Sequence, residues 1–178
     1  MRTLETQQVR PSIPSGKGIK IERAITVGLP APEVYTFWRR LENLPRFLHH
    51  IESVTQTDDR HSHWEVKAPR GKVVKWDAEI IEERSNEMFS WRSLPGSDVD
   101  NAGSVWFIPA PGGRGTVVKI SLKYAPPAGR LGAVVAKLWG RDAETEIAED
   151  LYRFKSLLEA GEIPTTQGQP RAAEGGRR

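Results

Sequence analysis

Apolar and polar residues alternate along most of the middle of the chain. In residues 19–27 four apolar side chains share one alternating face, with Arg23 as the exception, and this is the period of a half-buried β-strand. Short sequences rich in Gly, Pro, Asn and Asp separate the later segments, and links this short favour antiparallel hairpins. The further segments with strand composition are 51–58, 61–68, 72–83, 87–94, 103–109 and 115–124.

Two other regions have the period of a helix. Residues 32–40 place apolar side chains at i, i+3, i+4 and i+7, and Pro32 suits a helix start. A second short helix is expected at roughly 43–49, around Pro45. From about 130 to 160 a long helix is expected, in which the charged stretch between 141 and 149 marks a bend or a solvated face. Its apolar stripe consists of Leu131, Val134, Val135, Leu138, Ile147, Leu151, Phe154 and Leu158.

The order of elements predicts an α+β fold. A strand and two short helices are followed by about six strands and then by the long helix. One antiparallel sheet must bury an apolar face, and the C-terminal helix is the large element available to cover it. A curved sheet wrapped around a helix leaves room for a cavity between them.

Composition narrows the class of protein. The chain has 178 residues and no cysteine, which excludes a disulfide scaffold, a thiol nucleophile and a cysteine-ligated metal and fits a cytoplasmic location. No apolar run is long enough for a membrane-spanning helix. Segments 1–17 and 162–178 are polar and rich in Pro and Gly, so we expect disordered ends around one domain at 18–161.

The net charge of +3 comes from the ends of the chain. Residues 18–161 hold 20 basic and 20 acidic side chains, so the predicted domain is neutral by count. A nucleic-acid-binding face needs a basic stripe on the folded body. The charge distribution therefore argues against strong nucleic-acid binding.

Three motifs resemble a known superfamily. Pro32–Trp38 with Leu44–Phe47, then Trp76–Ile80 with Trp91–Ser93, and finally Leu122–Gly129 are similar to the polyketide cyclase/dehydrase-like bacterial group of the START-like (SRPBCC) superfamily. The resemblance covers about residues 18–161. It implies a helix-grip fold, in which the sheet wraps around the C-terminal helix. It also implies a hydrophobic cavity for a lipid-like, isoprenoid, quinone-like or polyketide-like molecule, with no fixed set of catalytic residues.

The tryptophans of the strands have two interpretations. Large aromatic side chains dominate protein cores, but the same residues would give a flat lining for a planar ligand. Inward-pointing hydroxyls such as that of Ser93 would hydrogen-bond a ligand. Trp106 is a further candidate. The residues expected to line the cavity are Trp64, Trp76, Trp91, Ser93, Phe107, Ile120, Leu131, Val135 and Leu138.

From the alternation we can assign no acid–base group to the inner face of the sheet. Asp77 and Glu79 fall opposite to Trp76, so both carboxylates should face water. His61 and His63 share a strand face, but no carboxylate at a suitable spacing completes a metal site. We therefore predict neither a metal nor a cofactor.

A glycine-rich segment at 112–115 lacks the Lys-Ser/Thr pair of a phosphate-binding loop, so it is expected to form a hairpin turn.

These features favour a binder or carrier of a hydrophobic small molecule over an enzyme. A cyclase or dehydrase of a polyketide-like substrate, acting in the same cavity, is the alternative. An RNA- or ribosome-associated role, as in the toxin-type relatives, is the weakest of the three. The apolar segment 130–141 is flanked by basic residues and has two interpretations. It is either part of the core over the sheet, or a cavity lid or surface that contacts a membrane transiently. The oligomeric state is not indicated by the sequence.

Overall fold

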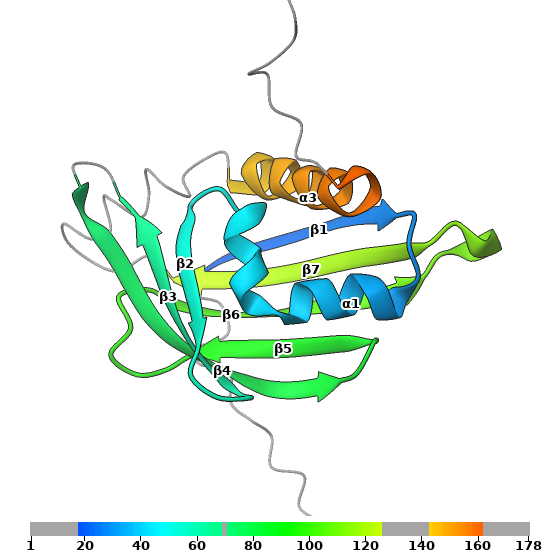
Figure 1. The fold of residues 1–178 in the computed structure, drawn as a ribbon. Helices are drawn as coiled ribbons and strands as arrows, with labels where there is room; N and C mark the ends of the chain where they lie inside the picture. Colours follow the sequence, from blue (N-terminus) through cyan, green and yellow to red (C-terminus); the bar gives the residue numbers. More distant parts are fainter. Residues whose placement is uncertain (1–17, 69–70, 126–142, 162–178) are drawn as a thin grey trace, which may run out of the picture.

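A computed structural model describes residues 18–68, 71–125 and 143–161. The order of elements agrees with the prediction, and Figure 1 shows the sheet curling around the helices. In chain order the elements are β1 (Ile19–Val27), α1 (Ala31–Arg39), η1 (Leu41–Arg46), β2 (Ile51–Gln56), β3 (His61–Lys67), β4 (Val73–Arg84), β5 (Met88–Ser93), β6 (Asp100–Pro109), η3 (Pro111–Gly113), β7 (Thr116–Ala125) and α3 (Ala143–Ala160).

The described strands form one antiparallel sheet in the order β1-β7-β6-β5-β4-β3-β2. Strands β2 to β7 are a meander, because each turn joins neighbours in the sheet. Strand β1 is separated from β2 in the chain by α1 and η1 and does not pair with it. Instead, β1 lies beside β7 at one edge of the sheet, and β2 forms the other edge. Helices α1 and α3 lie on the concave side of the curled sheet (Figure 1). The α+β helix-grip prediction is thus confirmed.

The face of the sheet toward these helices is called the inner face below. Ile21 and Val27 lie on it and are buried, as the alternation predicts. Arg23 is on the same face, and its Nη2 donates to Glu144 Oε2 at 2.7 Å. The apparent exception in the pattern of β1 therefore ties that strand to the first turn of α3.

Helix α1 is held to the end of β4 by a carboxylate. The Glu83 Oε1 accepts a hydrogen bond from Arg39 Nε at 2.7 Å and another from the Tyr35 hydroxyl. Burial and the Glu83 carboxylate raise the pKa of Tyr35 to about 12. The pKa of Glu83 is lowered, because Arg39 and Tyr35 outweigh the opposite effect of burial. Arg39 and Tyr35 thus tie α1 to the end of β4.

Element η1 is the second short helix of the prediction, but its bounds and type differ from the expected 43–49. It is a 3-10 helix over Leu41–Arg46 with Pro45 inside it. Proline has no N–H to donate and its ring disfavours a continuing α-helix. The Phe47 N–H donates to the Leu44 carbonyl at 3.1 Å, which is the tighter 3-10 pattern.

An aromatic cluster joins the helices. Phe154 of α3 is fully buried, and its ring centroid lies 4.9 Å from that of Trp38 and 4.8 Å from that of Phe47. Phe37 borders the same rings. This cluster belongs to a larger core group, and a second group gathers around Ile21, Val66 and Trp76 nearer the other end of the sheet.

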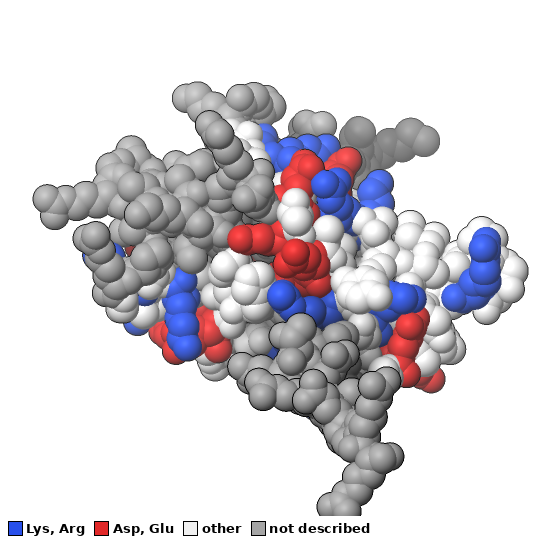
Figure 2. Space-filling model, turned by 90° about the horizontal axis from the view of Figure 1, so that it is seen from above, with Lys and Arg blue, Asp and Glu red and all other residues white. Residues whose placement is uncertain are grey.

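Helix α3 spans Ala143–Ala160. The earlier part of the predicted long helix, 130–142, lies outside the described residues, as do the ends 1–17 and 162–178, which were predicted to be disordered. Among the described helices, none has the length and apolar character needed to cross a membrane. Figure 2 looks down onto the side of the molecule that carries α3. The basic and acidic side chains drawn there are interspersed rather than gathered into a single-sign patch.

The segment at 112–115 is a turn, as predicted, between β6 and β7. Gly115 has a φ of +109°, and a Cβ at this residue would lie 2.0 Å from the Val27 carbonyl oxygen. Only glycine combines this backbone conformation with so close an approach. The turn lets β7 begin directly beside the end of β1.

Candidate functional site

A partly open cavity of about 140 Å³ lies between the two core groups and is lined by members of both. The sheet contributes aromatic and aliphatic side chains of its inner face. Leu44 of η1 and Leu48 close one side, and Ile147 and Leu151 of α3 close another. Almost all of its wall is therefore apolar.

Two tryptophans form one wall because they are register partners. Trp64 of β3 lies opposite Trp76 of β4, and their rings are stacked with centroids 5.8 Å apart and planes 14° apart. The Trp64 indole N–H donates to the Ser62 hydroxyl at 2.8 Å. Because this indole N–H has its partner inside the protein, the ring presents an apolar surface to the cavity.

Trp91 of β5 forms a neighbouring part of the wall. Its ring crosses Gly103 on β6, where a Cβ would lie only 2.5 Å from the ring atom Cζ2. Its indole N–H donates to Asn101 Oδ1 at 3.2 Å. The missing side chain at Gly103 is what lets the indole approach the neighbouring strand so closely.

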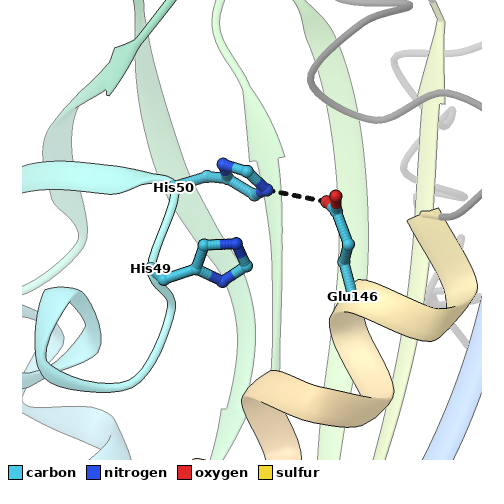
Figure 3. A group of neighbouring side chains, drawn as sticks. All are labelled: His49, His50 and Glu146. Atoms are coloured by element: carbon cyan, nitrogen blue, oxygen red, sulfur yellow. Dashed lines mark hydrogen bonds and ion pairs between the residues drawn. The ribbon is translucent and has the colours of Figure 1, made fainter. Parts of the chain in front are cut away.

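One end of the cavity is polar. His50 and Glu146 both line it, and the distance between His50 Nε2 and Glu146 Oε2 is 2.7 Å. Figure 3 shows the two side chains meeting from the segment before β2 and from the first turns of α3. Tyr124 also lines the cavity, and burial together with the nearby Glu146 carboxylate raises the pKa of Tyr124.

Asp150 is a buried carboxylate at the same wall, with only 7% of its side chain exposed. His49 Nδ1 and Arg153 Nη1 each lie 2.6 Å from Asp150 Oδ1. Arg153 Nη1 also lies 2.8 Å from His49 Nδ1. We assign the proton on His49 Nδ1 to the hydrogen bond with Asp150, because a carboxylate is the stronger acceptor. Burial raises the pKa of Asp150, although His49 and Arg153 act in the opposite direction.

These groups correct the expectation that no titratable side chain faces inward. The sequence contained a signal for Asp150. With Ala143, Ile147 and Phe154 it follows the 3–4-residue spacing of the stripe of α3 that packs inward. Glu149 stands four residues before Arg153 and lies 3.9 Å from it, whereas Asp150 is the closer partner at 2.6 Å. His50 and Glu146 had no such signal, because 96 residues separate them.

The residues predicted to line the cavity divide into three groups. Trp64, Trp76, Trp91 and Ile120 do line it. Phe107 and Ser93 are buried elsewhere. The Phe107 ring packs edge-on against Tyr35, with centroids 5.4 Å apart, because α1 covers that part of β6. The Ser93 hydroxyl accepts a hydrogen bond from the Asn101 N–H at 3.0 Å. The other three, Leu131, Val135 and Leu138, lie outside the described residues.

Trp106, the further candidate, is on the opposite, outer face of the sheet. Its register partner there is Lys119, whose ammonium group lies 5.7 Å from the ring centroid.

The two histidines of β3 also lie on the outer face, as does Asp77. His63 Nδ1 is 2.7 Å from Asp77 Oδ1, and His61 Nδ1 is 2.8 Å from Asp58 Oδ2. The hydrogen bond to Asp77 raises the pKa of His63. Glu65 also lies 3.3 Å from His63 Nε2, and Glu79 lies 3.8 Å from His61 Nε2. Carboxylates thus do approach these histidines, through the strand register and the preceding turn, but the two rings share none of them.

Comparisons with known proteins agree with this architecture. A family model described as polyketide cyclase / dehydrase and lipid transport matches residues 27–152. An uncharacterized 17.2 kDa protein from the melC2-rnhH intergenic region of Streptomyces lincolnensis is 30% identical over 146 residues, which are 79% of this chain and 89% of that protein.

Two solved structures illustrate the range of similarity. DR_A0006 from Deinococcus radiodurans is 37% identical with a TM-score of 0.66, over 81% of this chain and 99% of that one. The Zhui aromatase/cyclase from Streptomyces sp. R1128 is 12% identical with a TM-score of 0.59, over 80% and 97% of the two chains. At that identity the second similarity concerns the fold alone.

Proposed function

Because the chain belongs to the polyketide cyclase / dehydrase and lipid transport family, we propose that it binds a small hydrophobic molecule in the cavity between the sheet and α3. The observation that carries this proposal is the wall built by Trp64, Trp76 and Trp91. Ligand sites are mostly apolar surfaces with a few placed polar groups. This cavity has that composition, and His50, Glu146 and Asp150 are among its few polar lining residues.

The volume limits the size of the ligand. At about 140 Å³ the cavity is close to the engineered apolar cavity of ~150 Å³ that takes up benzene. Sites for drug-sized ligands are larger, roughly 300–1,000 Å³. The proposed occupant of the cavity is therefore a single aromatic ring or an apolar group of similar size, whereas a polycyclic molecule would extend out of its open side or require the walls to move apart.

The polar end suggests how such a ligand is oriented. His50 and Glu146 offer both donor and acceptor groups at the wall. A ring that carries a hydroxyl or carbonyl oxygen would place that oxygen here and its apolar edge against the tryptophans. We therefore expect p-cresol to bind more tightly than toluene, which has the same ring and methyl group without the hydroxyl.

Binding can be tested with a matched pair of tryptophan variants. Trp64→Leu removes a ring from the cavity wall, whereas Trp106→Leu removes one from the outer face of the same sheet. Titration of each protein with p-cresol, followed by calorimetry, should show weaker binding for Trp64→Leu and unchanged binding for Trp106→Leu. Equal binding by both variants and the wild type would contradict the proposal. Native mass spectrometry of the protein from its own host would then identify the natural ligand.

The same wall supports a second candidate function, the cyclisation or dehydration of a polyketide-like substrate. General acid–base catalysis needs a carboxylate or imidazole within hydrogen-bond reach of the substrate. His50 and Glu146 meet that requirement for a ligand in the cavity. Incubation with a small poly-β-ketone would give a cyclised product with the wild type and much less with Glu146→Gln. If the substrate is bound and released unchanged, the carrier function is favoured.

A further inference from the structure

His49, His50 and Glu146 form a group whose metal-ligating atoms all lie within 4.8 Å of one another (Figure 3). We propose that this triad binds a divalent transition-metal ion, such as Zn²⁺ or Fe²⁺, at the polar end of the cavity. Two imidazoles and one carboxylate are a donor set typical of such ions. Within 18–68, 71–125 and 143–161, no other group of three His, Cys, Asp or Glu residues meets this criterion.

The spacing of the atoms suits a shared ion. Metal–ligand bonds of about 2.0–2.2 Å place neighbouring ligand atoms about 2.8–3.6 Å apart in tetrahedral or octahedral geometry. The observed separations begin at 2.7 Å, between His50 Nε2 and Glu146 Oε2, and extend to no more than 4.8 Å. Small rotations of these partly exposed side chains would bring all three atoms to an ion, without movement of the backbone.

A supporting carboxylate orients one of the ligands. Ligating histidines nearly always donate the N–H of their other ring nitrogen to a carboxylate or a carbonyl. His49 Nδ1 is 2.6 Å from the buried Asp150 carboxylate, and Arg153 holds that carboxylate at 2.6 Å. This arrangement leaves Nε2 as the nitrogen of His49 that would ligate the ion.

The local charge also favours a cation. With both histidines neutral, Glu146 and Asp150 carry two negative charges and Arg153 carries one positive charge. A divalent ion would compensate the remaining negative charge in a partly buried location. It would also link the segment before β2 to the first turns of α3, two elements that are distant in the sequence.

Three protein ligands leave at least one coordination position open, which is typical of catalytic rather than structural sites. Two of the ligands, His50 and Glu146, line the cavity. An oxygen atom of a bound ligand would therefore lie beside the ion. Acting as a Lewis acid, the ion would polarise the bond from that oxygen to its carbon. This last step rests on the proposed function, whereas metal binding itself does not.

The test uses the full chain, stripped with a chelator and titrated with Co²⁺, whose visible absorption reports the ligand set. We expect stoichiometric binding by the wild type, displacement of Co²⁺ by Zn²⁺, and a higher unfolding temperature with metal, because an ion that binds only the folded state stabilises it. The variants His50→Ala and Glu146→Gln should lose binding. Asp150→Asn should weaken it about 10–100-fold, as is usual for a supporting residue.

The matched control is His63→Ala, which removes a carboxylate-paired histidine from the outer face and should bind Co²⁺ like the wild type. Circular dichroism of each variant verifies folding, and if His50→Ala is unfolded, His50→Gln replaces it. Absence of stoichiometric binding, or equal binding by His50→Ala and His63→Ala, would overturn the proposal. Because the titration contains no organic ligand, its result is independent of the p-cresol experiment.

Discussion

Gly103 gives the most direct test of how the cavity wall is built. In Gly103→Ala the new Cβ would lie 2.5 Å from Cζ2 of Trp91 and 2.6 Å from the carbonyl oxygen of Ser121. The first neighbour is a ring, which can move. The second is backbone in β7, held by the antiparallel pairing of β6 with β7.

The size of the effect follows from these contacts. Ordinary contact with a Cβ begins near 3.4 Å, so the two neighbours are 0.8–0.9 Å too close. Relief requires the Trp91 ring to leave its position and the two strands to separate locally. Overpacking of this kind costs about 1–3 kcal/mol of unfolding free energy. The Trp91 ring should be displaced as well, which would alter the cavity.

Urea unfolding followed by far-UV circular dichroism measures the cost without depending on tryptophan fluorescence. Gly28→Ala is the control, since its Cβ would meet only the end of the Glu159 side chain, at 3.2 Å, and should change stability by less than about 0.5 kcal/mol. The near-UV spectrum and p-cresol binding should change only in Gly103→Ala. A Gly103→Ala protein as stable as Gly28→Ala, with an unchanged near-UV spectrum, would refute this account of the wall.

Two further predictions concern the core and the outer face. Phe154→Ala should lower the unfolding free energy by about 3–5 kcal/mol, because the fully buried ring packs against Trp38. The control is Tyr152→Ala, which removes an exposed side chain from the same helix. It should lower the unfolding free energy by less than about 0.5 kcal/mol in the same urea assay. The hydrogen bond to Asp77 raises the pKa of His63. Its contribution to the free energy of unfolding is therefore fully present below the unfolded-state pKa of about 6.5. The contribution is lost as the pH rises through the folded-state pKa. The stability difference between wild type and His63→Gln should therefore be larger at acidic pH than at alkaline pH, and a difference that grows with pH would contradict this sign.

The sequence alone determined the order of the elements and the face on which most strand residues lie. Both depend on local patterns, because successive side chains of a strand point to opposite faces whatever the strand pairs with. Thus Trp76 was correctly placed on the inner face and Asp77 on the outer. The turn at 112–115 and the start of α1 were likewise readable from nearby residues; the helix begins at Ala31, one residue before Pro32. The family was identifiable because its motifs fall within these same short segments.

The tertiary structure decided which inner-face residues meet the cavity. The alternation in β6 places Phe107 on the inner face, as expected for a lining residue. Helix α1 covers that part of β6, so the Phe107 ring packs against Tyr35 instead. Trp64 and Trp76 stack because the register of β3 and β4 makes them partners, and register depends on pairing between segments rather than on either segment alone.

The polar end of the cavity is likewise a product of tertiary structure. Helical periodicity places Asp150 on the inward stripe of α3, but not beside any particular partner. His49 and Asp150 are 101 residues apart, and His50 and Glu146 are 96 apart. No local period connects residues at such distances. They meet only because α3 packs across the concave face of the sheet, where burial of its apolar stripe brings its first turns against the segment that leads into β2.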